Sequence, residues 1–179
     1  MKKLILFLLI ISSVTITLDA QNLTTDKAGT AISFKIKNLG FNVDGSFSDF
    51  KVDANFEADN LPNSYFVGTA VIKSIDTGIE GRNNHLQAEE YFHSEQYPEI
   101  KLASDKLKKT GTNQYEFTGK LTIKGKTKSL TFPITLEKSG QSILVKGNFE
   151  INRLDFEVGE SSWVLKKKVK VAIAYKGNF

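Results

Sequence analysis

The sequence predicts an all-β protein, an antiparallel β-barrel of about eight strands with a short helical insert between strands. Two observations predict this fold. Apolar and polar residues alternate through most of the chain after residue 30, which is the period of half-buried strands. Turn-forming residues separate the alternating rows at short intervals, so most connections have the length of hairpins. Closure into a barrel hides the edges of such a sheet, and a β-sandwich is the alternative.

The alternating rows follow one another along the chain. The expected strands are 32–36, 47–56, 66–75, 100–107, 115–123, 130–136, 143–151 and 169–175. The long polar connection 76–98 carries scattered apolar residues and suits one or two short helices that cover one end of the sheet. We expect a hairpin turn at Lys124-Gly125, with Gly125 at positive φ and the neighbouring lysines in water.

The N-terminus is typical of an export signal. Lys2 and Lys3 precede an unbroken apolar run over 4–11, and Ala20 is a suitable residue before a cleavage site. As a helix this run would span roughly 12 Å, well short of a ~30 Å hydrocarbon core. We therefore expect a cleaved signal peptide over 1–20, one mature domain over 21–179, and a periplasmic or secreted location in a bacterium.

Composition limits the function further. The 179 residues contain no cysteine, so a disulfide scaffold is excluded and packing must stabilise the fold. The net charge of +4 is too diffuse to predict nucleic-acid binding. The densest positive run, Lys166 to Lys170, has two interpretations. It is a solvated strand face that discourages edge pairing, or it makes transient contact with an anionic membrane surface.

Chemistry-bearing clusters are sparse. His85 and His93 are the only histidines, and zinc sites need three or four converging ligands. We therefore expect no metal site, no catalytic residue and no cofactor. Arg82 and His85 are expected to hydrogen-bond loop backbone and carboxylates, which would fix the helical insert on the barrel. An enzyme that uses His85 with Arg82 or Glu90 is the less favoured alternative.

Two segments carry a resemblance to a known family. One runs from Gly81 through His85-Leu86 to Pro98, and the other is Gly119 to Lys128. Together with Gly45 to Phe50 and Asn152 to Phe156, their order resembles the YceI-like family of secreted lipocalin-like barrels that bind polyisoprenoid lipids. The chain departs from the family pattern at three positions. Asn83 stands where Asp is usual, Leu102 where Phe is frequent, and Glu157 where Gly is common.

The resemblance implies a ligand, and the apolar inventory suggests where it would bind. We expect a polyisoprenoid or an isoprenoid-quinone-like lipid in the barrel interior, with the first hairpin and the helical insert framing the mouth. An interior that accepts such a chain needs an apolar lining with few polar groups. The candidate ligand-binding residues are Phe34, Ile36, Phe41, Val43, Phe47, Phe50, Phe117, Leu121, Phe132, Phe149 and Trp163, with Ile134 and Phe156 as weaker candidates.

Two questions stay open at this point. Each aromatic residue taken singly is also consistent with core packing, so a cavity-free secreted stress-response or interaction module is a second hypothesis. The sequence is compatible with a monomer or a homodimer.

Overall fold

The structure, a computed structural model, describes residues 22–179. The expected signal peptide over 1–20 lies outside the described residues. The strands are β1 (Thr24–Thr25), β2 (Ala31–Asn38), β3 (Phe41–Phe47), β4 (Phe50–Asn55), β5 (Tyr65–Val71), β6 (Ile75–Asp76), β7 (Glu99–Gly111), β8 (Gln114–Ile123), β9 (Lys126–Ser139), β10 (Ser142–Asn152) and β11 (Leu165–Asn178). The helix α1 (Glu80–Gln87) and the 3-10 turns η1 (Leu61–Asn63), η2 (Ile72–Ser74) and η3 (Arg153–Phe156) complete the described elements.

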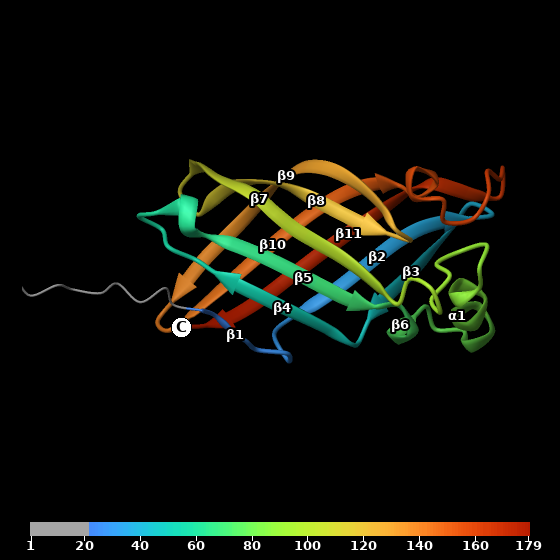
Figure 1. Cartoon of the computed structure of the whole chain (residues 1–179), viewed down its shortest axis with the longest axis horizontal. Coiled ribbons are helices and arrows are strands. Elements are labelled where there is room, and N and C mark those ends of the chain that lie inside the picture. Colours follow the sequence, from blue (N-terminus) through green and yellow to red (C-terminus); the bar gives the residue numbers. More distant parts are fainter. Residues whose placement is uncertain (1–21) are drawn as a thin grey trace, which may run out of the picture.

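All strands belong to one antiparallel sheet that curls on itself (Figure 1). Its order is β4-β5-β7-β8-β9-β10-β11-β2-β3-β6, with β1 beside β11. The path ends at β4 and at β6, and short segments pair with the strands at these two ends. Beside β4, the Leu23 N–H donates to the Ala54 carbonyl at 2.8 Å. At the other end β6 pairs with β3, and the Val71 N–H donates to the Asp49 carbonyl at 2.9 Å. The sheet therefore leaves little free edge.

The predicted antiparallel barrel with a helical insert is confirmed, and two predicted strands need correction. The row 47–56 is broken at Ser48-Asp49, because the chain turns there from β3 to β4. The row 66–75 ends at Val71, where η2 redirects the chain so that β6 can pair with β3. At both breaks two polar residues separate the apolar ones, Ser48-Asp49 after Phe47 and Lys73-Ser74 after Ile72, so the loss of period 2 marks these turns in the sequence.

The interior is packed at one end and hollow toward the other. The largest buried cluster fills the end near β1 and the β7–β8 hairpin with Phe56 and Tyr115, and its members Phe66, Phe117 and Phe132 also line the hollow. Two smaller clusters, one around Phe47 and Ile72 and one around Leu121 and Phe156, border the end that carries α1. No helix among residues 22–179 is long and apolar enough to cross a bilayer.

Candidate functional site

An apolar cavity of about 470 Å³ lies inside the barrel. This volume falls within the ~300–1,000 Å³ of ordinary ligand sites. Along β10 the lining runs from Val145 to Ile151, which corresponds to roughly 20 Å at ~3.3 Å per residue. Among the lining residues only Gly81 and His85 are exposed, and both lie on α1. The α1 end is therefore the mouth, and the hollow is deep rather than a surface groove.

Strand register builds one wall of this cavity. Phe149 of β10, Val171 of β11 and Phe34 of β2 are direct neighbours across the sheet, and all three line the hollow. The next row toward the mouth repeats the arrangement with Ile151, Val169 and Ile36. Because side chains alternate between faces, each row places apolar groups inward. These residues are only half-buried, since the space in front of them is empty.

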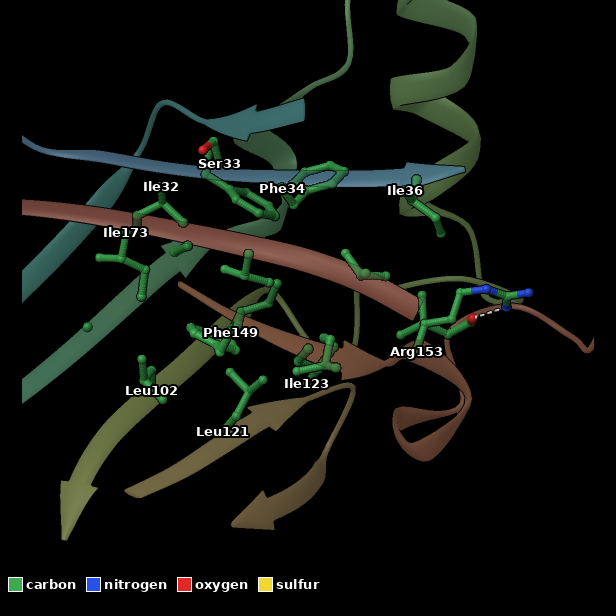
Figure 2. A pocket seen from close by; sticks show the side chains of 18 of the residues that line it. Ile32, Ser33, Phe34, Ile36, Leu102, Leu121, Ile123, Phe149, Arg153 and Ile173 are labelled. Atoms are coloured by element: carbon green, nitrogen blue, oxygen red, sulfur yellow. Dashed lines mark hydrogen bonds between the residues drawn. The ribbon is translucent and has the colours of Figure 1, made fainter. Parts of the chain in front are cut away.

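The opposite wall comes from β7 and β8. Figure 2 shows Leu102 and Leu121 across the hollow from Ile32 and Ile36. Gly68 of β5 also lines the cavity, and a methyl group added there would meet no atom within 4 Å.

Gly45 allows Phe34 to occupy its place on the cavity wall. The two residues are paired across β2 and β3, and a Cβ atom at Gly45 would overlap the Phe34 ring. The ring therefore lies over the glycine backbone. It also packs against Phe47 with ring centroids 5.8 Å apart.

Thr77, Arg82 and His85 are polar residues of the lining at the mouth, whereas Thr30 and Tyr175 line the inner end of the cavity. The Arg82 guanidinium donates through Nε to the Thr77 hydroxyl at 2.8 Å and through Nη2 to the Thr77 carbonyl at 2.6 Å. The Asn83 side chain accepts from the Thr77 N–H at 2.9 Å and donates to Asp76 at 3.2 Å. His85 Nε2 lies 3.3 Å from a Glu90 carboxylate oxygen. Arg82 bonds the loop backbone at Thr77 as expected, whereas the His85–Glu90 contact lies within the insert and does not tie it to the barrel.

A buried arginine completes this end. Arg153 is 4% exposed and donates to the carbonyls of Val158, Glu160, Leu165 and Lys166. Burial lowers the pKa of its guanidinium. Since no carboxylate faces it among its hydrogen-bond partners, its role is to tie the loop between η3 and β11 to the barrel.

The structure brings most of the predicted site residues together. Phe34, Ile36, Val43, Phe47, Phe117, Leu121, Phe132, Phe149 and Ile134 line the cavity. Contact of these side chains with a ligand stays a prediction.

Four predicted residues lie elsewhere. Phe50 and Phe156 are 6% and 2% exposed, because they are packed into the two smaller clusters that border the α1 end. Phe41 and Trp163 are 77% and 87% exposed at the outer end of the mouth, because the hairpin and loop that carry them project beyond the sheet. None of the four lines the cavity.

Sequence reasoning missed part of the lining. Ile151, Val169, Val171 and Ile173 face the hollow from β10 and β11. These residues alternate with polar or small ones in the sequence, so the signal was present. They were missed because aromatic residues were preferred as candidates for the lining. Gly68 and Arg153 gave no comparable signal.

A second, polar groove lies outside the mouth. His93 and Tyr97 border it with Lys124, Lys126 and Glu157. Gly125 has a φ of 71°, which confirms the predicted hairpin turn. Lys124, expected to face only water, instead donates to the carbonyls of Glu89 and Glu157 at 2.8 and 2.9 Å. No group of three or more potential metal-ligating side chains was found among residues 22–179.

Comparisons with known proteins agree on one family. The family model of the YceI-like domain matches residues 12–176. A UPF0312 protein from Photorhabdus laumondii is 36% identical over 111 residues, which cover 62% of this chain and 57% of that relative. The match thus spans little more than half the length of this relative.

Solved structures share the fold. The crystal structure of Burkholderia cenocepacia BcnA has a TM-score of 0.81 at 26% identity and covers 86% of this chain and 99% of its own. A polyisoprenoid binding domain from Saccharophagus degradans has a TM-score of 0.71 at 14% identity, with 89% and 98% covered.

Proposed function

Because the chain belongs to the family of YceI-like domains, we propose that it binds a polyisoprenoid or a similar long-chain apolar lipid inside its barrel. In this proposal the protein sequesters or carries the lipid and does not change it chemically. The single observation that carries the proposal is the deep apolar cavity of about 470 Å³ behind α1. The description of the Saccharophagus domain as polyisoprenoid binding supports the ligand class.

The distribution of polar groups orients the proposed ligand. The inner lining is formed by side chains such as Phe117, Phe132 and Val171, whereas Thr77, Arg82 and His85 lie at the mouth. An amphiphilic lipid would enter with its tail first and leave its head group near α1. A quinone or another polar head group would find hydrogen-bond donors there, which is compatible with an isoprenoid-quinone-like ligand.

Energetics favour a long tail. Burying one five-carbon isoprene unit contributes up to about 4 kcal/mol at ~0.8 kcal/mol per methylene-sized group. Association itself costs ~4–15 kcal/mol. Several units must therefore enter together for firm retention, and a cavity that extends along β10 suits this requirement.

Export belongs to the same proposal. A lipid carrier outside the cytoplasm fits the signal-like N-terminal segment. A periplasmic or secreted location follows from this proposal. Cell fractionation would contradict it by finding the protein in the cytoplasm at its full uncleaved length.

Uptake of a labelled prenyl alcohol from detergent micelles tests the proposal. Val171→Glu places a carboxylate in the apolar wall, and we expect it to weaken uptake at least about tenfold. Ala172→Glu is the matched control, because its side chain points to the opposite face of β11. If neither the parent protein nor the control takes up the label, the proposal fails.

A catalytic role for His85 is the second candidate, because His85 lines the mouth and pairs with Glu90. We expect the lipid to be recovered chemically unchanged after incubation with the protein. A modified product that disappears in His85→Ala would favour the enzyme.

A further inference from the structure

The β2–β3 hairpin and the loop before β11 present an apolar surface to solvent beside the cavity mouth. Leu39, Phe41 and Trp163 are 63%, 77% and 87% exposed. The Leu39 N–H donates to the Val164 carbonyl at 3.0 Å, which joins the two segments into one surface. Ile79, the remaining large apolar residue that is exposed within residues 22–179, stands at the start of α1, at the same end of the barrel (Figure 1). We call Leu39, Phe41, Trp163 and the flanking Lys37, Lys166 and Lys167 the docking patch.

Folding alone does not account for this patch. Leu39 and Gly40 form a two-residue hairpin turn with φ values of 51° and 84°. Asparagine and glycine suit such turns, whereas leucine is disfavoured in the left-handed region and gains nothing here from burial. Single exposed apolar residues are ordinary, but a group of them at one end of a protein marks an interaction site.

The charge around the patch is positive. Segments 35–44 and 160–170 contain six lysines against two acids, Asp44 and Glu160. Asp44 is paired with Lys35 at 3.0 Å, and Lys168 is paired with Glu150 at 2.8 Å. Lys37, Lys166 and Lys167 are exposed and have no ion pair within the described part of the chain. These three ammonium groups are therefore available to anionic groups outside the protein.

We propose that the docking patch seats the mouth of the barrel on an anionic lipid bilayer. The role of the docking patch in lipid transfer rests on the proposed function, whereas the exposure and charge of its residues do not depend on any ligand. Tryptophan favours the interface between headgroups and acyl chains, and lysines beside an apolar surface are attracted to anionic headgroups. A second copy of the chain would have to bring the same unpaired lysines together, which like-charge repulsion disfavours. With the mouth against the bilayer, an apolar tail would pass into the cavity without crossing water.

Trp163 provides the readout, because it is the only tryptophan of the chain. Its emission should shift to shorter wavelength with vesicles of phosphatidylglycerol and phosphatidylcholine, and not with phosphatidylcholine alone. The double variant Lys166→Gln/Lys167→Gln should weaken vesicle partitioning roughly thirtyfold. Lys108→Gln/Lys109→Gln is the matched control at the far end of β7 and should partition like the parent. Phe41→Ser/Trp163→Ser should remain in the supernatant when vesicles are sedimented.

Two results would overturn the inference. One is unchanged Trp163 emission together with no sedimentation on anionic vesicles. The other is an emission shift that appears on concentrating the protein without vesicles, since a second copy would then cover the patch.

Uptake from micelles, which contain no bilayer, separates this inference from the proposed function. Vesicle binding without prenyl uptake would leave the docking patch standing and remove the carrier. Uptake without vesicle binding would do the reverse.

Discussion

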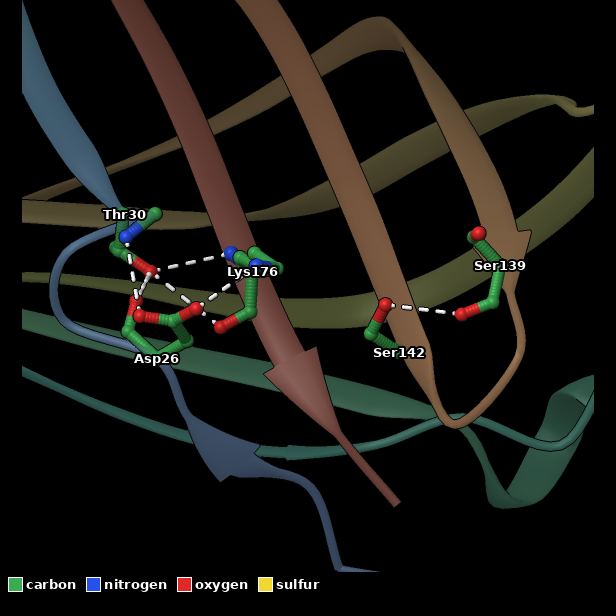
Figure 3. Close-up of polar contacts among 6 residues, drawn as sticks. Asp26, Thr30, Ser139, Ser142 and Lys176 are labelled. Atoms are coloured by element: carbon green, nitrogen blue, oxygen red, sulfur yellow. Dashed lines mark hydrogen bonds and ion pairs between the residues drawn. The ribbon is translucent and has the colours of Figure 1, made fainter.

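A cluster of polar groups around Asp26 fastens the N-terminal segment to β11 at the end of the barrel away from α1 (Figure 3). The Asp26 carboxylate lies 2.9 Å from Lys176 Nζ and accepts from the Gly29 N–H at 3.1 Å. The Thr30 hydroxyl donates to the Asp26 carbonyl at 2.8 Å, and the Lys176 N–H donates to that hydroxyl at 3.1 Å. The hydrogen bond from Lys176, followed by the one from Gly29, lowers the pKa of Asp26.

A lowered folded-state pKa predicts a pH dependence of stability. The contribution of Asp26 is complete above the ordinary aspartate pKa of about 3.9, and it is lost as the pH falls from there through the lowered folded-state value. Asp26→Asn should therefore reduce the free energy of unfolding at pH 7, and its difference from the parent should shrink in acid. Urea unfolding at a series of pH values measures this.

The control for this prediction is Asp59→Asn, which changes an exposed turn residue whose side chain makes no hydrogen bond within the described part of the chain. It should follow the parent at every pH. A gap between parent and Asp26→Asn that stays constant down to pH 2 would contradict the account.

Glu157 illustrates what a sequence does not show about a single residue. It has a φ of 56° at the end of η3, a conformation that favours glycine. Its carboxylate is paired with Lys126 at 2.9 Å, and the hydrogen bond from Lys126 lowers the pKa of Glu157. The sequence shows that Glu157 replaces the glycine expected from the resemblance. It does not show the ion pair with Lys126, because that pair depends on where the β8–β9 hairpin lies in the folded chain.

Among the elements, the segments at the mouth depend on polar contacts more than on apolar burial. No residue of α1 is buried, and its first turn is held through the bonds of Arg82 and Asn83 to Thr77. The sequence predicted this insert from its length and composition. It could not predict which backbone groups the polar side chains would bond, because those groups come together only in the folded chain.

Replacing Arg153 tests whether this side chain holds the loop between η3 and β11 on the barrel. Arg153→Lys keeps the charge but cannot reach four separate carbonyls with one ammonium group, so buried acceptors lose their donors. We expect a loss of about 2–3 kcal/mol in the free energy of unfolding. We also expect faster amide exchange in 158–166. Arg82→Lys, on the more exposed α1, should cost less. Unchanged exchange in 158–166 would show that Arg153 does not hold this loop.

For the whole molecule, period-2 patterning predicted most of the strands and their inward faces, because one buried side fixes the register of a strand, but the expected strands left out residues 41–46 of β3. It did not predict how the interior is divided. The Phe56–Tyr115 cluster fills one end of the barrel, while residues of the same kind around Phe149 border a hollow. Whether a ring packs or lines a cavity depends on what stands across the barrel, and Gly68, which has no side chain, leaves space there.

Filling the cavity with an added side chain tests whether this part of the barrel interior is the lipid site. Gly68→Leu adds an apolar side chain where a Cβ atom meets nothing within 4 Å. It should lower prenyl uptake at least about tenfold while leaving the free energy of unfolding equal to the parent's or up to about 2 kcal/mol higher. Thr69→Leu, on the outer face of the same strand, is the control and should bind like the parent. Undiminished uptake by Gly68→Leu would mean that the lipid binds elsewhere.

Mass spectrometry of solvent extracts from the protein purified out of the cells that naturally produce it measures the central claim most directly. The account predicts a long-chain apolar lipid close to one molecule per chain, and much less of it with Gly68→Leu produced in the same cells. Extracts of the parent protein that contain no stoichiometric lipid would contradict the account.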